Sequence, residues 1–393
     1  MRAVRMGWRA TDGVRLLLAV VALGYGLLAV FRAPTYWTWE MAVLATEWGY
    51  GIAALALVLV LPRARRTAAG RLAAGIAVLA AAMLLSPLAR AVPVAHELPA
   101  RMREAFGDAQ ARSLPGAPAR PQPLAPLDML RGVRSPGVRV RTFVYADRAD
   151  GPLRMDVYSP PGRGPAPAVI VIHGGSWRGG DRKQLPPLNR YLAARGYVVA
   201  AIEYRLAPKH RAPDALADVL TALRFLEANA PALGVDPRRI VLMGRSAGGQ
   251  LALLAAYRAH DPAVRGAISF YAPTDLVYGY AHPANPAVLD SRVILRAFLG
   301  GTPDDDLPGY VAASPLAFVG PDTPPTLLVH GGRDELVWVV HSEMLDSALA
   351  AAGRPHLLLR LPWSTHACDF AFSQPCGQLS TWAVEHFLAA VTR

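Results

Sequence analysis

Three long apolar segments dominate the first 91 residues. They cover about residues 14–31, 41–61 and 72–89, with short loops between them. Each is close to the roughly 20 residues that a helix needs to cross the hydrocarbon core of a bilayer. Three such segments in close succession are better explained as membrane spans than as helices buried in a water-soluble core. The pattern therefore predicts that residues 1–91 form a multi-pass membrane anchor.

Arginine placement predicts the orientation of this anchor. Arginines gather before the first segment and between the second and third, at Arg2, Arg5, Arg9, Arg15, Arg63, Arg65, Arg66 and Arg71. The loop between the first and second segments has only Arg32, together with several aromatic residues. Because positive charge favours the cytoplasmic side, the N-terminus is expected in the cytoplasm. After three crossings, the chain beyond residue 90 is expected on the extracytoplasmic side of the cell membrane.

Residues 92–137 are predicted to form a linker or a cap segment. The stretch "GAPARPQPLAP" is proline-rich and typical of extended chain. The stretch "HELPARMREAFGDAQARSL" favours a short amphipathic helix, either on the membrane or over the active site, and the sequence leaves both placements open. Ala89–Ala91 also resembles a signal-peptide cleavage site, but the two spans ahead of it favour a retained anchor.

From about residue 138 the pattern changes to short β-rich runs that alternate with helical stretches. The expected strands cover residues 139–146, 153–159, 168–173, 197–204, 239–243, 266–271, 326–330 and 356–361. The first two alternate like an antiparallel pair. The following ones are almost continuously apolar, as parallel strands buried on both faces are. Residues 138–393 are therefore expected to fold as one α/β domain, with a mostly parallel eight-stranded sheet flanked by helices.

The stretch "VLMGRSAGGQLALL" contains a Gly-x-Ser-x-Gly turn with Ser246 at its centre. The turn follows an expected strand and opens an expected helix, which is the context that makes this motif informative. Neighbouring glycines let strand and helix approach closely around a side chain on a sharp turn. That context disfavours a chance match among the many small residues of this chain. Ser246 is thus the candidate nucleophile.

A serine nucleophile needs a base, and the base needs an acid that orients it. Asp334 and His366 fit the chain order Ser, Asp, His, and each directly follows a late strand. The competing residues are Asp304, Asp305, Asp306 and Asp369 for the acid, and His341 and His386 for the base. The first three lack a preceding strand, and the fourth is too close in sequence to the base. Both competing histidines fall at or inside expected helices.

A loop rich in glycine follows the third expected strand, in "VIVIHGGSWRGGD". Backbone N–H groups of Gly174 and Gly175, with that of Ala247 after the nucleophile, are predicted to form an oxyanion hole. His173 is expected to brace this loop rather than act as a second base. Trp177 is expected to pack beside the pocket.

Six motifs together carry a family resemblance. They are "HGGSW" at 173–177, "EYRLAP" at 203–208, "GRSAGG" at 244–249, "APTDL" at 272–276, "HGGRDELV" at 330–337 and "STHACDF" at 364–370. The set resembles the α/β-hydrolase superfamily over residues 138–393, and most of all the hormone-sensitive-lipase-like and feruloyl-esterase-like carboxylesterases. The resemblance does not extend to residues 1–137.

The resemblance implies a Ser-His-Asp triad and no cofactor. Carried over by position, Ser246 is the nucleophile, Asp334 the acid and His366 the base, and Gly174, Gly175 and Ala247 supply the oxyanion hole. The oxyanion loop reads Gly-Gly-Ser, whereas three glycines are common in the lipase-like branch. This departure puts the identity of the individual N–H donors in doubt.

Composition and charge exclude few classes of protein, but they indicate which partners to expect. The formal net charge is +12, yet the arginines are scattered without a dense run, which disfavours a nucleic-acid surface. The two cysteines, Cys368 and Cys376, cannot build a metal cluster by spacing. Outside the cytoplasm they would form a disulfide next to His366, and the alternative is two free thiols. The oligomeric state is left open.

The combined features predict a membrane-anchored serine carboxylesterase that hydrolyses small or lipid-like carboxylic esters. An amidase or peptidase on the same fold is one alternative. A membrane-tethered binding protein without catalysis is another, which the complete set of site residues disfavours.

Overall fold

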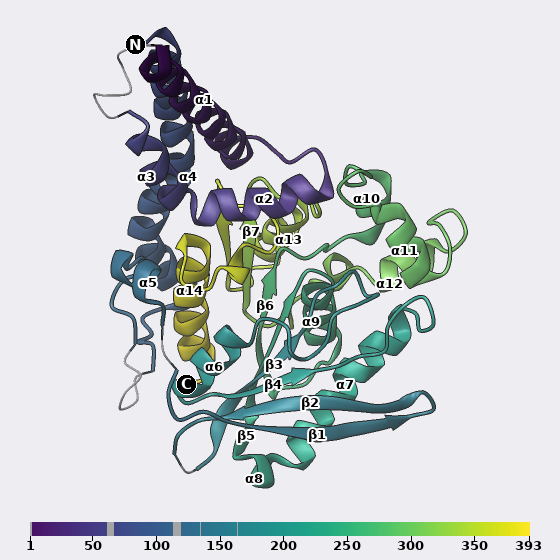
Figure 1. Cartoon of the computed structure of the whole chain (residues 1–393). Helices are drawn as coiled ribbons and strands as arrows, with labels where there is room; N and C mark the ends of the chain where they lie inside the picture. Colours follow the sequence, from purple (N-terminus) through teal and green to yellow (C-terminus); the bar gives the residue numbers. More distant parts are fainter. Residues whose placement is uncertain (1, 61–66, 113–118, 134, 163) are drawn as a thin grey trace.

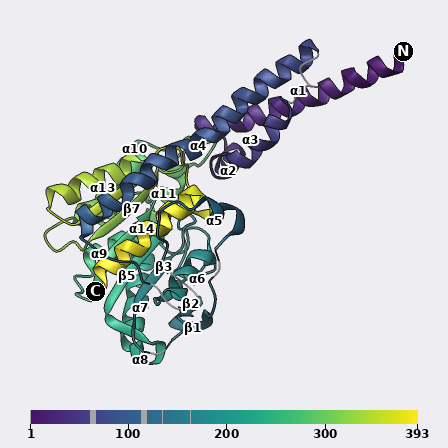
Figure 2. The same ribbon diagram turned by 90° about the vertical axis from the view of Figure 1, so that its left-hand side faces the viewer.

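The computed structural model describes residues 2–60, 67–112, 119–133, 135–162 and 164–393, with side chains from residue 11 onward. Figure 1 shows a sheet covered by helices, with a bundle of N-terminal helices rising from one side of it. Figure 2 shows that this bundle projects well beyond the α/β part. The loop with Arg63, Arg65 and Arg66, on which the predicted orientation partly depends, lies outside the described residues.

The projecting bundle consists of four helices. They are α1 (Arg2–Val30), α2 (Tyr36–Glu47), α3 (Gly49–Val58) and α4 (Ala68–Phe106). Two of the described helices, Thr11–Val30 and Ala68–Phe106, are long and apolar enough to cross a membrane. The segment expected as one span at 41–61 is instead the pair α2 and α3, bent by 79°. The bend occurs at Trp48, whose backbone leaves the helical region at φ −110° and ψ 12°.

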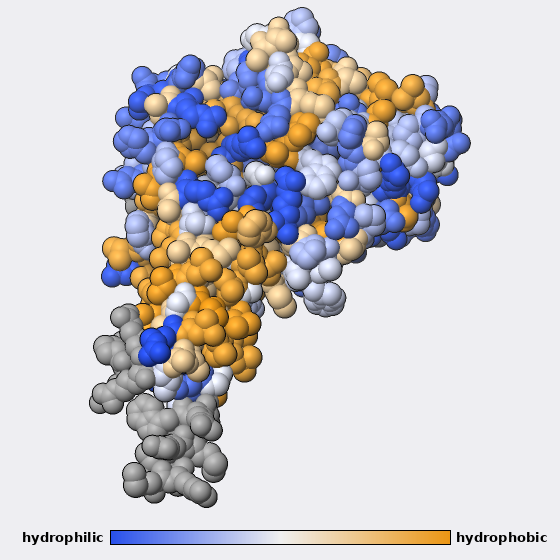
Figure 3. Space-filling model, turned by 90° about the horizontal axis from the view of Figure 1, so that it is seen from above, coloured by the Kyte–Doolittle hydropathy of each residue, from blue (hydrophilic) through white to orange (hydrophobic). Residues whose placement is uncertain are grey.

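Small residues let the helices of the bundle approach closely. Ala19, Ala22, Ala73, Ala77 and Ala80 are buried together between α1 and α4. A Cβ atom on Gly49 would lie 2.6 Å from the carbonyl oxygen of Leu84, so α3 and α4 touch through their backbones. Such close contacts are typical of helices that pack in lipid. Figure 3 shows the outer surface of the bundle as largely apolar, in contrast to the mixed surface of the α/β part.

Helix α4 continues well past the expected boundary at residue 91. It contains Pro87, Pro93 and Pro99 and ends at Phe106, where Gly107 caps it at φ 73°. Its last turns pack on the α/β part: Leu98 is buried there, and the ring of Phe106 lies 4.9 Å from that of Phe387. The first third of the expected linker, up to Phe106, is therefore an extension of α4 that packs on the α/β core.

The α/β domain has the eight strands that the sequence predicts. They are β1 (Arg139–Arg148), β2 (Gly151–Ser159), β3 (Ala166–Ile172), β4 (Val198–Ile202), β5 (Val235–Arg245), β6 (Val264–Phe270), β7 (Thr326–Gly331) and β8 (His356–Leu361). Their order in the sheet is β1-β2-β4-β3-β5-β6-β7-β8. Strand β2 runs antiparallel to both β1 and β4, and all later pairs are parallel. The predicted α/β architecture is confirmed.

Helices cover both faces of this sheet. Beyond the N-terminal bundle they are α5 (Pro126–Arg131), α6 (Pro186–Ala194), α7 (Ala212–Ala228), α8 (Ala230–Leu233), α9 (Ala247–Arg258), α10 (Leu276–Ala281), α11 (Ser291–Leu299), α12 (Leu307–Ala312), α13 (Val340–Ala351) and α14 (Pro375–Val391). One apolar core joins the sheet to α7, α9 and α13. A second core joins it to α6, α14 and the end of α4. The carboxyl ends of the parallel strands meet at one edge, where ligand sites of such sheets form.

Helix α2 lies across that carboxyl edge of the sheet (Figure 1). At its start the N–H of Tyr36 donates to the carbonyl of Ala287 at 3.0 Å. At its end the carboxylate of Glu47 accepts from the N–H of Cys376 at 3.0 Å. The helix is thus tied at its start to the loop of Ala287 and at its end to the first turn of α14.

Replacing Leu98 by alanine tests whether the end of α4 belongs to the α/β core. Leu98 is 1% exposed, so Leu98→Ala is expected to cost about 2–5 kcal/mol and to lower the midpoint of thermal unfolding. Leu130, 75% exposed, offers the same change as a control, and Leu130→Ala should leave the midpoint nearly unchanged. Equal midpoints for both variants would show that α4 does not contribute to this core.

Candidate active site

Ser246 occupies a strained turn between β5 and α9. Its backbone has φ 53° and ψ −121°, a conformation that residues with a Cβ rarely adopt. A Cβ on Gly244 would lie 2.0 Å from the carbonyl oxygen of Gly248, and one on Gly248 would lie 2.2 Å from that of His173. Both glycines are therefore required for this close approach. The Ser246 side chain makes no capping hydrogen bond to α9, so its own helix leaves Oγ available.

Asp334 and His366 come together from the loops that follow β7 and β8. His366 Nδ1 lies 2.6 Å from Asp334 Oδ2 in a buried hydrogen bond. The other carboxylate oxygen accepts from the N–H groups of Leu336 at 2.9 Å and Val337 at 2.8 Å. The acid therefore fixes one ring nitrogen of His366 and leaves Nε2 for another partner.

Asp334 is held in its charged form. Burial alone would raise the pKa of this carboxyl, but the charge of His366 and hydrogen bonds from His330 and His366 hold its pKa well below the usual range. Sequence reasoning missed His330, whose Nε2 lies 3.3 Å from Asp334 Oδ2. The sequence did contain a signal: His330 lies four residues before Asp334, near the end of the strand that leads into the Asp334 loop. A carboxylate that stays ionised can support a protonated imidazole beside it.

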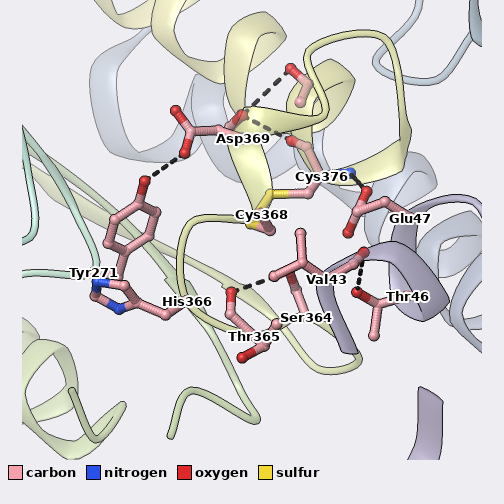
Figure 4. Close-up of a disulfide and its surroundings, with 12 residues drawn as sticks. Val43, Thr46, Glu47, Tyr271, Ser364, Thr365, His366, Cys368, Asp369 and Cys376 are labelled. Atoms are coloured by element: carbon pink, nitrogen blue, oxygen red, sulfur yellow. Dashed lines mark hydrogen bonds between the residues drawn. A yellow bond between two sulfur atoms is a disulfide. The ribbon is translucent and has the colours of Figure 1, made fainter. Parts of the chain in front are cut away.

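Ser246 is brought to the acid and base through its neighbours on β6. Its N–H donates to the carbonyl of Phe270 at 2.8 Å. The next residue, Tyr271, has its ring centroid 4.3 Å from that of His366 (Figure 4). The three predicted residues thus lie at the same carboxyl edge of the sheet. Among the described residues a hydrogen bond joins the acid to the base, and none joins Ser246 to His366.

A buried ion pair links the serine turn to the histidine loop. Arg245, directly before Ser246, places its Nε 2.5 Å from Asp369 Oδ2. The same carboxylate accepts a hydrogen bond from the Tyr271 hydroxyl, which Figure 4 shows. Asp369 was considered only as a competing acid in the sequence. The structure gives it a different place, as a brace between the two loops.

The glycine loop after β3 packs directly against the serine turn. A Cβ on Gly174 would lie 2.9 Å from the carbonyl oxygen of Arg245 and 3.3 Å from Ser246 Cβ, so only glycine fits there without a shift of the serine turn. The N–H of Gly174, however, donates to Gln184 Oε1 at 2.7 Å. In this structure Gly174 is therefore not a free oxyanion donor, contrary to the expectation. Ala247 begins α9 and is buried, and the N–H of a first helical residue has no acceptor within its own helix.

His173 and Trp177 brace the glycine loop, and Trp177 also borders a small cavity. The His173 ring stacks on Tyr204 at 4.3 Å, and burial lowers the pKa of His173. Trp177 stacks on Phe298 at 4.3 Å and donates to Gln250 at 3.0 Å. An apolar cavity of about 50 Å³ lies beside Trp177, lined by residues of α10, α11 and the segment after Asp334. These placements agree with the expectations for both side chains.

The other residues considered as the acid or the base make structural contacts. Asp306 caps α12 by accepting from the N–H of Gly309, and Asp305 accepts from Thr302. His341 is buried on α13, and burial lowers its pKa to about 3. His386 stacks on Trp382 within α14. Across the described residues, no group of three or more His, Cys, Asp or Glu side chains is arranged to hold a metal ion.

Cys368 and Cys376 form a disulfide two residues beyond His366. Their sulfur atoms are bonded, and the pair joins the histidine loop to the first turn of α14 (Figure 4). The structure thus chooses the disulfide over the two free thiols that the spacing also allowed.

Known proteins resemble this chain over the same region. A family model described as BD-FAE matches residues 155–349. The probable carboxylic ester hydrolase LipM of Mycobacterium tuberculosis is 30% identical over 66% of this chain and 65% of its own. Esterase LipC of the same organism is 32% identical over 58% of this chain and 59% of its own. The chain thus spans about 60 to 65% of the lengths of these relatives.

A solved structure agrees with these sequence relatives. The Pyrobaculum calidifontis esterase is 25% identical, covers 67% of this chain and 88% of its own, and superimposes with a TM-score of 0.57. The match is to an esterase with the same α/β fold. Fold, family model and relatives agree, and together they support a resemblance of this chain to the hormone-sensitive-lipase-like esterase superfamily of α/β-hydrolases.

Proposed function

We propose that this protein is a serine carboxylesterase in which Ser246 is the nucleophile, His366 the base and Asp334 the acid. The observation that carries the proposal is the buried 2.6 Å hydrogen bond between Asp334 and His366, at the sheet edge that also bears the strained turn of Ser246. The three residues occur in the chain order Ser, Asp, His, each on a loop at the end of a strand. Enzymes of this fold that catalyse acyl transfer have this arrangement. The esterase names of the relatives favour ester substrates.

The proposed reaction proceeds through an acyl-enzyme. His366 Nε2 takes the Ser246 Oγ proton while Oγ attacks the ester carbonyl, and the same proton then passes to the leaving alcohol. Water, activated by His366, repeats the sequence and releases the carboxylic acid. The N–H groups of Gly175 and Ala247 are the proposed donors to the oxyanion. The N–H of Gly174 could join them only if its hydrogen bond to Gln184 were broken. The main role of Gly174 is to let the glycine loop approach Ser246 closely.

We further propose that the enzyme is a multi-pass protein of the cell membrane with its catalytic domain outside the cytoplasm. Residues 138–393 would form that domain, and α1, α3 and the first part of α4 the anchor. The apolar outer surface of the bundle, the arginine distribution and the disulfide support this arrangement. Exposed aromatic and apolar residues on α2, among them Trp37 at 72% exposure, suit a membrane interface at the active-site edge. Small or lipid-like esters are the substrates that this position favours.

The role of Ser246 is tested by ester turnover. Ser246→Ala is expected to lower kcat for a short-chain aryl ester by about 10⁶-fold, since the nucleophile is lost. Ser347→Ala, on the exposed side of α13, is a matched control that should keep full activity. Hydrolysis of a matching aryl amide at a higher rate than the ester would favour the amidase alternative. Full ester activity in Ser246→Ala would refute the assignment.

The role of Asp334 is tested by a nearly isosteric change. Asp334→Asn keeps the side-chain shape but removes the charge that orients and supports the imidazole, so kcat should fall by about 10⁴-fold. Because the pKa of Asp334 lies well below its usual range, the acid stays ionised from mildly acidic pH upward. Its titration should therefore not limit the wild-type pH–rate profile in that range. A variant that retains wild-type kcat would contradict the role of this acid.

The location of the catalytic domain is tested through its cysteines. Disulfides persist in oxidising compartments and are rare in the cytoplasm. Alkylation directly in cells, followed by non-reducing peptide mapping, should recover the peptides of Cys368 and Cys376 as one linked pair. Cys376→Ser provides the control, because it leaves Cys368 as a free thiol, which is buried and is therefore alkylated once the protein is unfolded in the reagent. Recovery of both thiols alkylated in the wild type would place the domain in the cytoplasm.

A further inference from the structure

The two residues on either side of Asp334 reach out of the catalytic domain to the end of α1. Arg333 Nη1 donates to the carbonyl of Ala29 at 2.7 Å, and Nη2 donates to that of Leu28 at 2.9 Å and also to that of Phe31. Carbonyl groups at the end of a helix lack partners within it and carry partial negative charge. Arg333 thus caps the carboxyl end of the first apolar helix with a buried cation.

Glu335 makes a second connection from the other side of the acid. Its Oε1 accepts from the N–H of Ala33 at 2.9 Å, and its Oε2 accepts from the hydroxyl of Thr365. Thr365 directly precedes His366, and Glu335 itself is 2% exposed. One carboxylate therefore joins three segments: the chain that leaves α1, the loop of the acid and the loop of the base.

The acid and base loops also touch each other at this point. The N–H of Arg333 donates to the carbonyl of Ser364 at 3.0 Å. Removing α1 and the chain that leaves it would take the carbonyls of Leu28, Ala29 and Phe31 from Arg333, which would keep only that of Trp363 at 3.3 Å. Glu335 would lose the Ala33 amide. Buried charges without partners are costly, so the two loops would rearrange to expose them to water. A shift of about 1 Å in such loops is enough to weaken catalysis about 10²-fold.

We propose that Arg333 and Glu335 are positioning residues, which fasten the loops of Asp334 and His366 to the carboxyl end of α1 and thereby make hydrolysis depend on the first membrane helix. The inference rests on the proposed function, since it assigns Asp334 and His366 as the acid and base. It gives the N-terminal helices a part in catalysis beyond attachment to a membrane.

The test uses the full-length protein in detergent micelles and a short-chain soluble ester. Arg333→Ala and Glu335→Ala are each expected to lower kcat by about 10- to 100-fold with little change in KM, because the substrate pocket is intact while the acid–base geometry is loosened. Glu335→Gln should recover most of the activity, since its amide can accept from Ala33 and donate to Thr365. Arg195→Ala is the matched control, because it removes another buried arginine, paired with Glu385 at 2.5 Å.

A double-mutant cycle separates positioning from a general loss of structure. If Arg333 acts through the acid, Arg333→Ala should cost little further activity in a protein that already carries Asp334→Asn. Wild-type kcat in both alanine variants, a fully additive cycle, or an equal fall of kcat in Arg195→Ala would each overturn the proposal. An inactive wild type, or an active Asp334→Asn, would instead refute the proposed function itself.

Discussion

The buried hydrogen bond between Asp334 and His366 sets the requirements that the surrounding structure meets. An ionised carboxylate without access to water is stable only when its oxygens are fully paired. Two amides of its own loop, His330 and His366 provide that pairing. The partners come from the ends of β7 and β8, which a parallel sheet brings to the same edge as the serine turn after β5. The order of the strands therefore determines which groups can pair with the buried Asp334 carboxylate.

The same edge joins the α/β domain to the N-terminal helices. Arg333 and Glu335 extend the polar network from the acid to the end of α1, and Glu47 ties the end of α2 to the start of α14. The brace from Arg245 to Asp369 and the neighbouring disulfide hold the histidine loop from its other side. The site is thus enclosed by buried charges and cross-links that span both parts of the chain. Helix packing and site geometry are expected to respond together to changes in either part.

Local patterns predicted much of this molecule, and long-range contacts account for what they missed. Eight short β-rich runs predicted eight strands, and the glycines around Ser246 predicted its sharp turn. The third apolar segment ends near residue 89, but the helix continues to Phe106, where its last turns pack Leu98 on the α/β core. The bend at Trp48 comes directly after Thr46 and Glu47, which interrupt the apolar run, although the length of the run favoured a single span. The bond from Gly174 to Gln184 and the contact from Glu335 to Ala33 depend on the tertiary fold, so neither residue type nor spacing revealed them.

Mapping the site of covalent labelling tests the central claim most directly, because it reports which side chain is activated. The full-length protein, treated with a fluorophosphonate and digested, should carry one adduct per chain, on Oγ of Ser246. This result is expected because Ser246 is the proposed nucleophile and lies on the strained turn at the sheet edge that also carries His366 and Asp334. An adduct on a different serine, or no adduct on folded protein, would contradict the account.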